Sequence, residues 1–272
     1  MHPVLFEIGP FSLHSYGLMM AIAFALGIWI ASHRAPQRGI ESKFILDLAV
    51  LTLIFSLVGA RATYVFTHLD EFRGHWIDTI SPIQSDGKIG IAGLVLLGGV
   101  VAGFAAAYVI TKRKQVGFLT ITDILVPSLA LGIGIGRIGC FLNGCCPGSP
   151  GDYGWCMVFP EESLTGSIYP HIHVHPTQLY ETVAMLGVFA FLLWYDRKPR
   201  PLGMLTGWFL VLYGVWRFYL EGLRWYEEGM IVTNIGDMRL TLSRLISAGM
   251  IVVGIFLYLK VKNRPPVEKI KS

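Results

Sequence analysis

The sequence predicts an all-α polytopic membrane protein, because its composition is apolar and its apolar runs have the length of a membrane span. Only 15% of the 272 residues are charged, 53% are hydrophobic, and the mean hydropathy is +0.57. Soluble domains carry about a quarter charged residues, and about twenty apolar residues suffice to cross a bilayer as a helix. Seven runs meet this length: Tyr16–Ser32, Phe44–Phe66, Ile89–Thr111, Phe118–Cys140, Gln178–Tyr195, Gly203–Glu221 and Leu240–Leu259.

The first and fourth runs each need a choice between two interpretations. No Lys or Arg precedes Arg34, so the first run lacks the basic segment of a signal peptide and is expected to be a retained span.

In the fourth run Gly134, Gly136 and Gly139 match the dinucleotide fingerprint G-x-G-x-x-G. The strand before and the helix after that the fingerprint requires are missing. These glycines predict close helix packing instead, with space beside Arg137.

Charge in the connections orients the predicted helices. Of the 22 basic residues, fourteen fall after the first, third and fifth runs or in the tail, and few fall in the alternate connections: Arg73, Lys88, Arg224 and Arg239. Cytoplasmic loops are enriched in Lys and Arg, so we expect the amino terminus outside, the carboxyl terminus in the cytoplasm, and seven spans instead of six or eight. The net charge of +4 then reflects the membrane topology and an attraction to anionic lipids, and no nucleic-acid partner is expected.

The outer connections are the longer ones. No repeat or flexible linker divides the chain, so we expect one membrane domain over 1–272. Long ordered loops usually carry function, and Phe141–Pro176, rich in Gly and Pro, predicts a small periplasmic cap. The alternating histidines at 171–175 have no acidic partner nearby, so no metal site is predicted there.

Four arginines fall within predicted spans or at their outer ends: Arg61, Arg137, Arg217 and Arg244. An arginine at the bilayer centre costs about 2.5–3.5 kcal/mol on insertion scales. One interfacial arginine is often an anchor, but four toward one leaflet favour a basic cavity open to that side.

The sixth run carries polar side chains on one helical face, at Tyr213, Arg217, Glu221 and Arg224. Residues four apart on a helix are neighbours, so Arg217 and Glu221 can pair. The pair either stabilises the bundle alone, or Glu221 holds the arginines for an anion such as phosphate. In the same outer layer lie His14 and Tyr16 at the start of the first run and HPTQLYE at 175–181.

The four cysteines, Cys140, Cys145, Cys146 and Cys156, are all predicted on the outer side, which oxidises thiols. A disulfide from Cys145 or Cys146 to Cys156 is one alternative, and unpaired thiols are the other. Their spacing is not a usual ligand pattern, so we expect no zinc site. We also expect no catalytic cysteine, because no histidine stands beside Cys146 in the sequence.

One family unites these features. The segment GRIGCFLNGCCPG resembles the signature of bacterial prolipoprotein diacylglyceryl transferases, and FSLHSYGLM, ARATYV, HPTQLYE, RKPRP and YGVWRFYLEGLR are similar to family segments in the same order. The resemblance covers essentially the whole chain. It implies transfer of the diacylglyceryl group of phosphatidylglycerol to the lipobox cysteine of a preprolipoprotein signal peptide. A thioether and glycerol 1-phosphate are formed at the outer face of the bacterial inner membrane, without a cofactor or metal.

The resemblance also implies which residues act. A leaving phosphate needs fixed cations at headgroup depth, and Arg137 and Arg217 fit this role, oriented by Glu221. The expected catalytic residues are Arg137, Arg217, Glu221 and Tyr16. The expected substrate-binding residues combine motif positions with the basic residues above: Arg137, Asn143, Gly148, His14, Tyr213, Arg224, Arg61 and Arg244.

Two positions depart from the family pattern. Cys140 stands where the signature usually has Asn, and Leu97 stands where well-studied members have a histidine considered as a base. Either the base lies elsewhere in the chain or no base is required. A thiol with a pKa of about 8.5 is already partly thiolate at neutral pH, and nearby arginines lower that pKa, which favours the second interpretation. The departures leave one alternative, a non-catalytic phospholipid-binding or lipid-translocating relative. A small-solute transporter is less favoured, because no repeat relates two halves of the chain.

Overall fold

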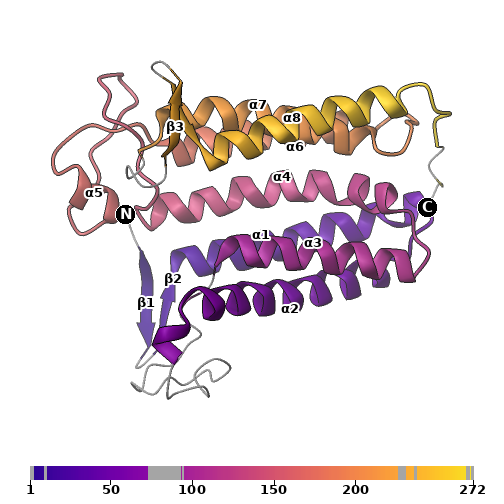
Figure 1. Cartoon of the computed structure of the whole chain (residues 1–272), viewed down its shortest axis with the longest axis horizontal. Helices are drawn as coiled ribbons and strands as arrows, with labels where there is room; N and C mark the ends of the chain where they lie inside the picture. The colour runs from indigo at the N-terminus through magenta and orange to yellow at the C-terminus, as the bar shows by residue number, and fades with distance from the viewer. Residues whose placement is uncertain are drawn as a thin grey trace. The chain divides into compact units, whose positions relative to one another are not determined.

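The computed structural model describes residues 3–8, 11–72, 93, 95–225, 231–235, 238–267 and 270. The chain forms two compact units, one comprising Met1–Gly39 with Thr122–Ser272 and the other comprising Ile40–Ile121 (Figure 1). That the two units form a single membrane domain over 1–272 stays a prediction.

The body of both units is helical. The smaller unit contains α2 (Ser42–Thr67), a 3-10 turn (Leu69–Phe72), α3 (Leu96–Arg113) and the first residues of α4. The larger unit contains α1 (Ser15–Arg34), a 3-10 turn (Pro36–Arg38), the rest of α4 (Phe118–Leu142), α5 (Leu164–Ile168), α6 (Thr177–Tyr195), α7 (Met204–Leu220), a 3-10 turn (Glu221–Leu223) and α8 (Leu242–Val261).

The helix boundaries agree closely with the apolar runs. Every predicted end lies within two residues of a helix end except that of the third run, where the helix begins at Leu96 instead of Ile89. Residues 89–92 lie outside the described part of the chain, as do the basic residues Arg73, Lys88, Lys269 and Lys271. Within the described residues six helices, α1, α2, α3, α4, α6 and α8, are long and apolar enough to cross a membrane.

The all-α prediction is confirmed for the body of the chain, and the larger unit also contains two short antiparallel hairpins. Strand β1 (Val4–Ile8) pairs with β2 (Phe11–His14), and β3 (Ile231–Ile235) pairs with β4 (Met238–Thr241). Their segments are rich in β-branched and aromatic residues, which favour strands. Each hairpin leads directly into a membrane helix, α1 or α8.

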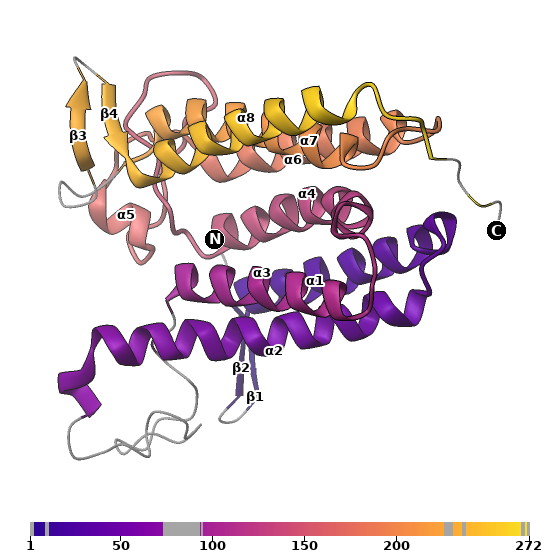
Figure 2. The same cartoon turned by 45° about the vertical axis from the view of Figure 1, so that its right-hand side comes forward.

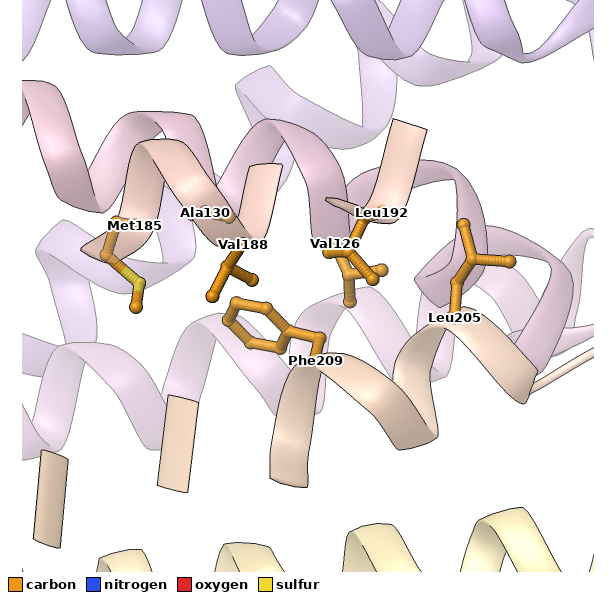
Figure 3. Packing of buried hydrophobic residues seen from close by; sticks show 7 residues of the cluster. All are labelled: Val126, Ala130, Met185, Val188, Leu192, Leu205 and Phe209. Atoms are coloured by element: carbon orange, nitrogen blue, oxygen red, sulfur yellow. The ribbon is translucent and has the colours of Figure 1, made fainter. Parts of the chain in front are cut away.

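The core of the larger unit lies between α4, α6 and α7. Figure 3 shows its seven buried members: Val126, Ala130, Met185, Val188, Leu192, Leu205 and Phe209. Within each helix these residues are three or four positions apart, so each helix buries a single face. The ring of Phe209 lies beside Val188 in this view.

Glycines let neighbouring helices approach closely. A Cβ added to Gly214 of α7 would lie 2.9 Å from the carbonyl oxygen of Ser247 in α8, and one added to Gly254 would lie 2.9 Å from the carbonyl oxygen of Gly207. In the smaller unit, a Cβ on Gly59 of α2 would lie 2.8 Å from the carbonyl oxygen of Gly98 in α3. Small residues at such crossings allow backbone contact, which stabilises helix pairs in lipid.

A buried ion cluster joins the carboxyl end of α1 to that of α6. Arg34 and Arg38 lie 3.1 and 2.6 Å from the carboxylate of Asp196, which is 4% exposed. Pro127 lacks an N–H, so it leaves the carbonyl of Asp123 without its helical donor. That carbonyl accepts a hydrogen bond of 3.0 Å from Arg34. Arg34 and Arg38, two basic residues of the connection between the first two helices, therefore have a structural role.

Candidate active site

Several chain segments meet at one end of the larger unit. The carboxyl ends of α4 and α7 and the amino ends of α6 and α8 lie there, together with α5 and the β3–β4 hairpin (Figures 1 and 2). Most of the residues singled out in the sequence belong to these ends.

Glu181 of α6 is the centre of this region. Its side chain is 2% exposed, and its Oε2 lies 2.7 Å from Nε of Arg137 in α4 and 3.2 Å from Nη1 of Arg217 in α7. One carboxylate thus joins the two arginines that the sequence predicted to act together. Sequence reasoning placed Glu181 in the outer polar layer but missed it as a site residue. The available signal was an acidic side chain inside a span, which requires a partner.

Glu221 is the second buried carboxylate. Its Oε2 lies 3.3 Å from Nη2 of Arg217, and its Oε1 accepts a hydrogen bond of 2.7 Å from Thr241. Nε of Arg217 donates to Oγ of Ser243 at 3.3 Å. The predicted pairing of Arg217 with Glu221 is confirmed, and the guanidinium is fixed by three neighbours.

The two kinds of charge differ in exposure. The side chains of Arg137 and Arg217 are 20% and 12% exposed, whereas those of Glu181 and Glu221 are 2% and 1% exposed. Pairing reduces the cost of burying these charges. The bond from Arg137 to Glu181 uses Nε, which leaves the two terminal amino groups to donate to an anion. Oε1 of Glu181 has no hydrogen-bond partner among the described residues.

The glycine-flanked turn after α4 is held against α6. Gly144 and Cys146 adopt left-handed backbone angles, with φ of 67° and 64°. Nε2 of the buried Gln178 donates to the carbonyl oxygens of Cys145 and Cys146 at 2.6 and 3.2 Å. Gln178 was not predicted as a site residue, yet it fixes the turn that carries the family-like signature.

Gly148 occupies a position with no space for a side chain. A Cβ there would lie 2.9 Å from the Cβ of His175. Its backbone forms an isolated antiparallel bridge with Arg224. Gly148 therefore brings the signature turn against the segment that follows α7, and its role in binding substrate stays a prediction.

The four cysteines are free thiols, so neither proposed disulfide to Cys156 is formed. Cys156 instead lies with its Sγ 3.6 Å from Nδ1 of His175. The sulfur atoms of Cys140, Cys145 and Cys146 all lie within 4.8 Å of one another. Side-chain hydrogen bonding with Cys140 and Cys145, and after it the charges of Arg224 and Arg137, lower the pKa of Cys146.

Four other predicted residues lie in α1 and α7 or directly next to α1 and α4. Tyr16 is the second residue of α1 and lies beside Gly139, where an added Cβ would lie 3.3 Å from the tyrosine ring. Tyr213 stacks on Phe209 with ring centroids 5.7 Å apart. Asn143 follows the last residue of α4 and bonds through its backbone N–H to Gly139 at 3.0 Å. His14 immediately precedes α1 and is exposed.

Arg244 has a structural environment next to the site. It is 9% exposed, its Nη1 donates to the carbonyl of Arg239 in β4, and its guanidinium lies 5.5 Å from the ring centroid of Phe218. It thus fastens the β3–β4 hairpin to α8 and to the end of α7.

Two positions of interest belong to the smaller unit. Arg61 donates to the carbonyl of Gly93 at 3.2 Å and lies 5.7 and 5.2 Å from the ring centroids of Tyr64 and Phe72. Leu97 is 57% exposed. A role of Arg61 in binding substrate stays a prediction.

Fold and site together define an integral membrane protein with two arginines, from separate helices, held by buried glutamates at one end of the bundle. The sequence model of a family described as prolipoprotein diacylglyceryl transferase matches residues 3–260. The chain belongs to this family.

Relatives that carry the name phosphatidylglycerol--prolipoprotein diacylglyceryl transferase match almost the full chain. The protein of Clostridium tetani is 31% identical over 95% of this chain and 97% of its own. That of Aliivibrio fischeri is 34% identical over 99% and 94%, and that of Vibrio vulnificus is 35% identical over 94% and 89%.

Proposed function

We propose that this chain transfers the diacylglyceryl group of phosphatidylglycerol to the lipobox cysteine of a preprolipoprotein. The sulfur forms a bond to the glycerol carbon, and the bond from that carbon to the phosphate oxygen breaks. A thioether results, and glycerol 1-phosphate leaves with the electron pair. Family membership and the names of the relatives support this activity. The observation that carries it in the structure is the placement of Arg137 and Arg217 on one carboxylate, Glu181.

The arginine pair is suited to the leaving group. The phosphodiester carries one negative charge and gains a second as the carbon–oxygen bond breaks. Arg137 and Arg217 are already fixed by Glu181 and Glu221, so they need no reorganisation when that charge develops. Preorganised donors of this kind stabilise a transition state more than a ground state. Glu181 and Glu221 act as positioning residues.

The remaining site residues bind the substrate in this proposal. Tyr16 and Asn143 lie beside the signature helix end and are assigned to the headgroup and the acceptor. Gly148 keeps the adjoining turn close to the segment after α7. Four further residues are also assigned to substrate binding: His14, Tyr213, Arg224 and Arg244. Arg61 is assigned to lipid on charge alone.

We also propose seven spans in the inner membrane, with α7 as the additional one. Its 17 residues extend about 25 Å at 1.5 Å per residue, and the 3-10 turn Glu221–Leu223 continues it. The basic connections then lie in the cytoplasm and the site faces the periplasm, since positive charge accumulates on the inner side. The loop that contains α5 forms the periplasmic cap.

Purified protein in phosphatidylglycerol micelles with a one-cysteine lipobox peptide tests the activity. We expect the mass of one diacylglyceryl group on the peptide and none on a Cys-to-Ser peptide. Arg137→Ala should lose at least a hundredfold in rate, while Arg264→Ala, in the exposed tail, should keep the wild-type rate. A wild-type protein that binds the lipid but leaves the peptide unmodified would instead be the non-catalytic relative.

A further inference from the structure

Three thiols converge at the carboxyl end of α4, and the transfer reaction as proposed does not use them. We propose that Cys140, Cys145 and Cys146 form a three-thiolate site for one zinc ion, and that its open fourth position binds the acceptor thiol. The metal site follows from the geometry of the cysteines. Its role toward the acceptor rests on the proposed function.

The sulfur positions match those of a zinc site. Zinc–thiolate bonds of about 2.3 Å in tetrahedral geometry place neighbouring sulfurs about 3.8 Å apart. The sulfurs of Cys145 and Cys146 are 3.7 Å apart, and all three lie within 4.8 Å of one another. Binding therefore requires only small adjustments of the side-chain torsions. A sulfur separation of 3.7 Å is far from the bond of about 2.05 Å that defines a disulfide.

The backbone is built to bring the thiols together. The N–H of Cys145 donates to the carbonyl of Cys140 at 3.2 Å, which folds the turn back on the helix end. Cys146 has a left-handed φ of 64°, a conformation that is uncommon for residues other than glycine. Gln178 holds the carbonyls of Cys145 and Cys146 from α6. Such outliers persist where the surrounding structure enforces them, often at functional sites.

Charge also favours an ion at this position. Three thiolates and one Zn²⁺ carry a net charge of −1. Arg137 precedes Cys140 by three residues in α4, and the backbone of Arg224 is bridged to Gly148, two residues after Cys146. The arginines would offset that charge, and the metal would lie next to the proposed binding site of the leaving phosphate.

A bound zinc ion would deprotonate the acceptor thiol, which Leu97 cannot do. A zinc ion with three protein ligands keeps one position open, and a thiol that coordinates it is deprotonated outright. The acceptor cysteine would release its proton to water on binding and attack the glycerol carbon as a thiolate. The phosphate leaves with the carbon–oxygen electron pair, and the product thioether, a weaker ligand, dissociates. No general base at position 97 is needed.

Metal binding is tested on the full-length protein in detergent without substrate. Zinc per chain is measured after removal of excess metal, and Co²⁺ substitution is followed through sulfur-to-cobalt charge-transfer absorption. We expect one ion per chain and at least tenfold weaker binding in Cys145→Ser and Cys146→Ser. Cys156→Ser is the matched control, because Cys156 lies against His175 outside the cluster. Wild-type protein without a thiolate–cobalt band, or with a disulfide among the three cysteines, would overturn the site.

The role of the ion is tested with the peptides. The lipobox peptide should change the charge-transfer band, its Cys-to-Ser form should not, and chelation should remove transfer until Zn²⁺ is restored. Arg137→Ala should keep the metal and lose transfer. Full transfer by metal-free protein refutes this inference and leaves the proposed function intact. A metal-loaded protein that shows the peptide-dependent band without any transfer refutes the proposed function alone.

Discussion

Replacing Glu181 by glutamine removes the charge that joins Arg137 and Arg217 and leaves a side chain of the same shape. Breaking a buried ion pair costs about 3–5 kcal/mol when a charge stays buried without compensation. Here both arginines are partly exposed, at 20% and 12%, and Arg217 keeps Glu221, so we expect about 1–3 kcal/mol of lost stability. Misaligned donors should reduce kcat by about 10²–10³-fold, in the range found for removal of one preorganised donor.

Turnover of the lipobox peptide and thermal unfolding in detergent measure the two effects separately. Because the arginines act on charge that develops in the transition state, kcat should fall by a larger factor than KM rises. Glu161→Gln is the matched control: Glu161 pairs with His171 at 2.7 Å, but the side chains are 63% and 83% exposed. That variant should resemble the wild type. If Glu181→Gln retains kcat within threefold, the two arginines do not depend on their shared carboxylate, and the reasoning is wrong.

Three further substitutions test separate parts of the structure. Arg217→Lys keeps the charge but loses the planar fork that reaches both glutamates, so turnover should fall about a hundredfold in the peptide assay. Gly148→Ala forces a Cβ against His175 and should destabilise the fold by about 1–3 kcal/mol, seen as a lower thermal midpoint. Asp196→Asn leaves two buried guanidinium groups without their counter-charge and should lower stability by about 2–4 kcal/mol, with turnover per folded molecule unchanged.

Controls separate these effects from general sensitivity to mutation. Gly154→Ala adds a Cβ where no atom lies within 4 Å, so its midpoint should not change. Arg113→Lys lies in the exposed carboxyl end of α3 and should keep full turnover. Wild-type turnover in Arg217→Lys would mean that only charge matters at that position. A change in turnover per folded molecule in Asp196→Asn would show that the ion cluster acts on the chemistry.

The helices were predictable because length and apolarity are local properties of the sequence. Arg217 and Glu221 were also predictable as a pair, since four residues separate them on one helix. Glu181 was not, because its partners come from α4 and α7 and their convergence depends on tertiary packing. The same holds for Arg34, because its partners are Asp196 and the carbonyl of Asp123, which are far from it in the sequence.

The cysteines show a second limit of spacing rules. The pattern of Cys140, Cys145 and Cys146 matches no common metal motif, and so it predicted no site. The thiols meet where the backbone of Gly144 and Cys146 is left-handed. A left-handed conformation is uncommon for a residue other than glycine, so the sequence does not indicate it at Cys146. The hairpins that precede α1 and α8 were missed for a simpler reason, since their strands are short and adjoin much longer apolar runs.

The most direct test of the central claim is the stoichiometry of the two products in one reaction. Wild-type protein with phosphatidylglycerol and the lipobox peptide should form one thioether-linked diacylglyceryl peptide for each glycerol 1-phosphate released. Both products should be absent with Arg137→Ala or with the Cys-to-Ser peptide. Glycerol 1-phosphate without modified peptide, or bound lipid with neither product, would contradict the assignment of the arginine pair to transfer onto a thiol.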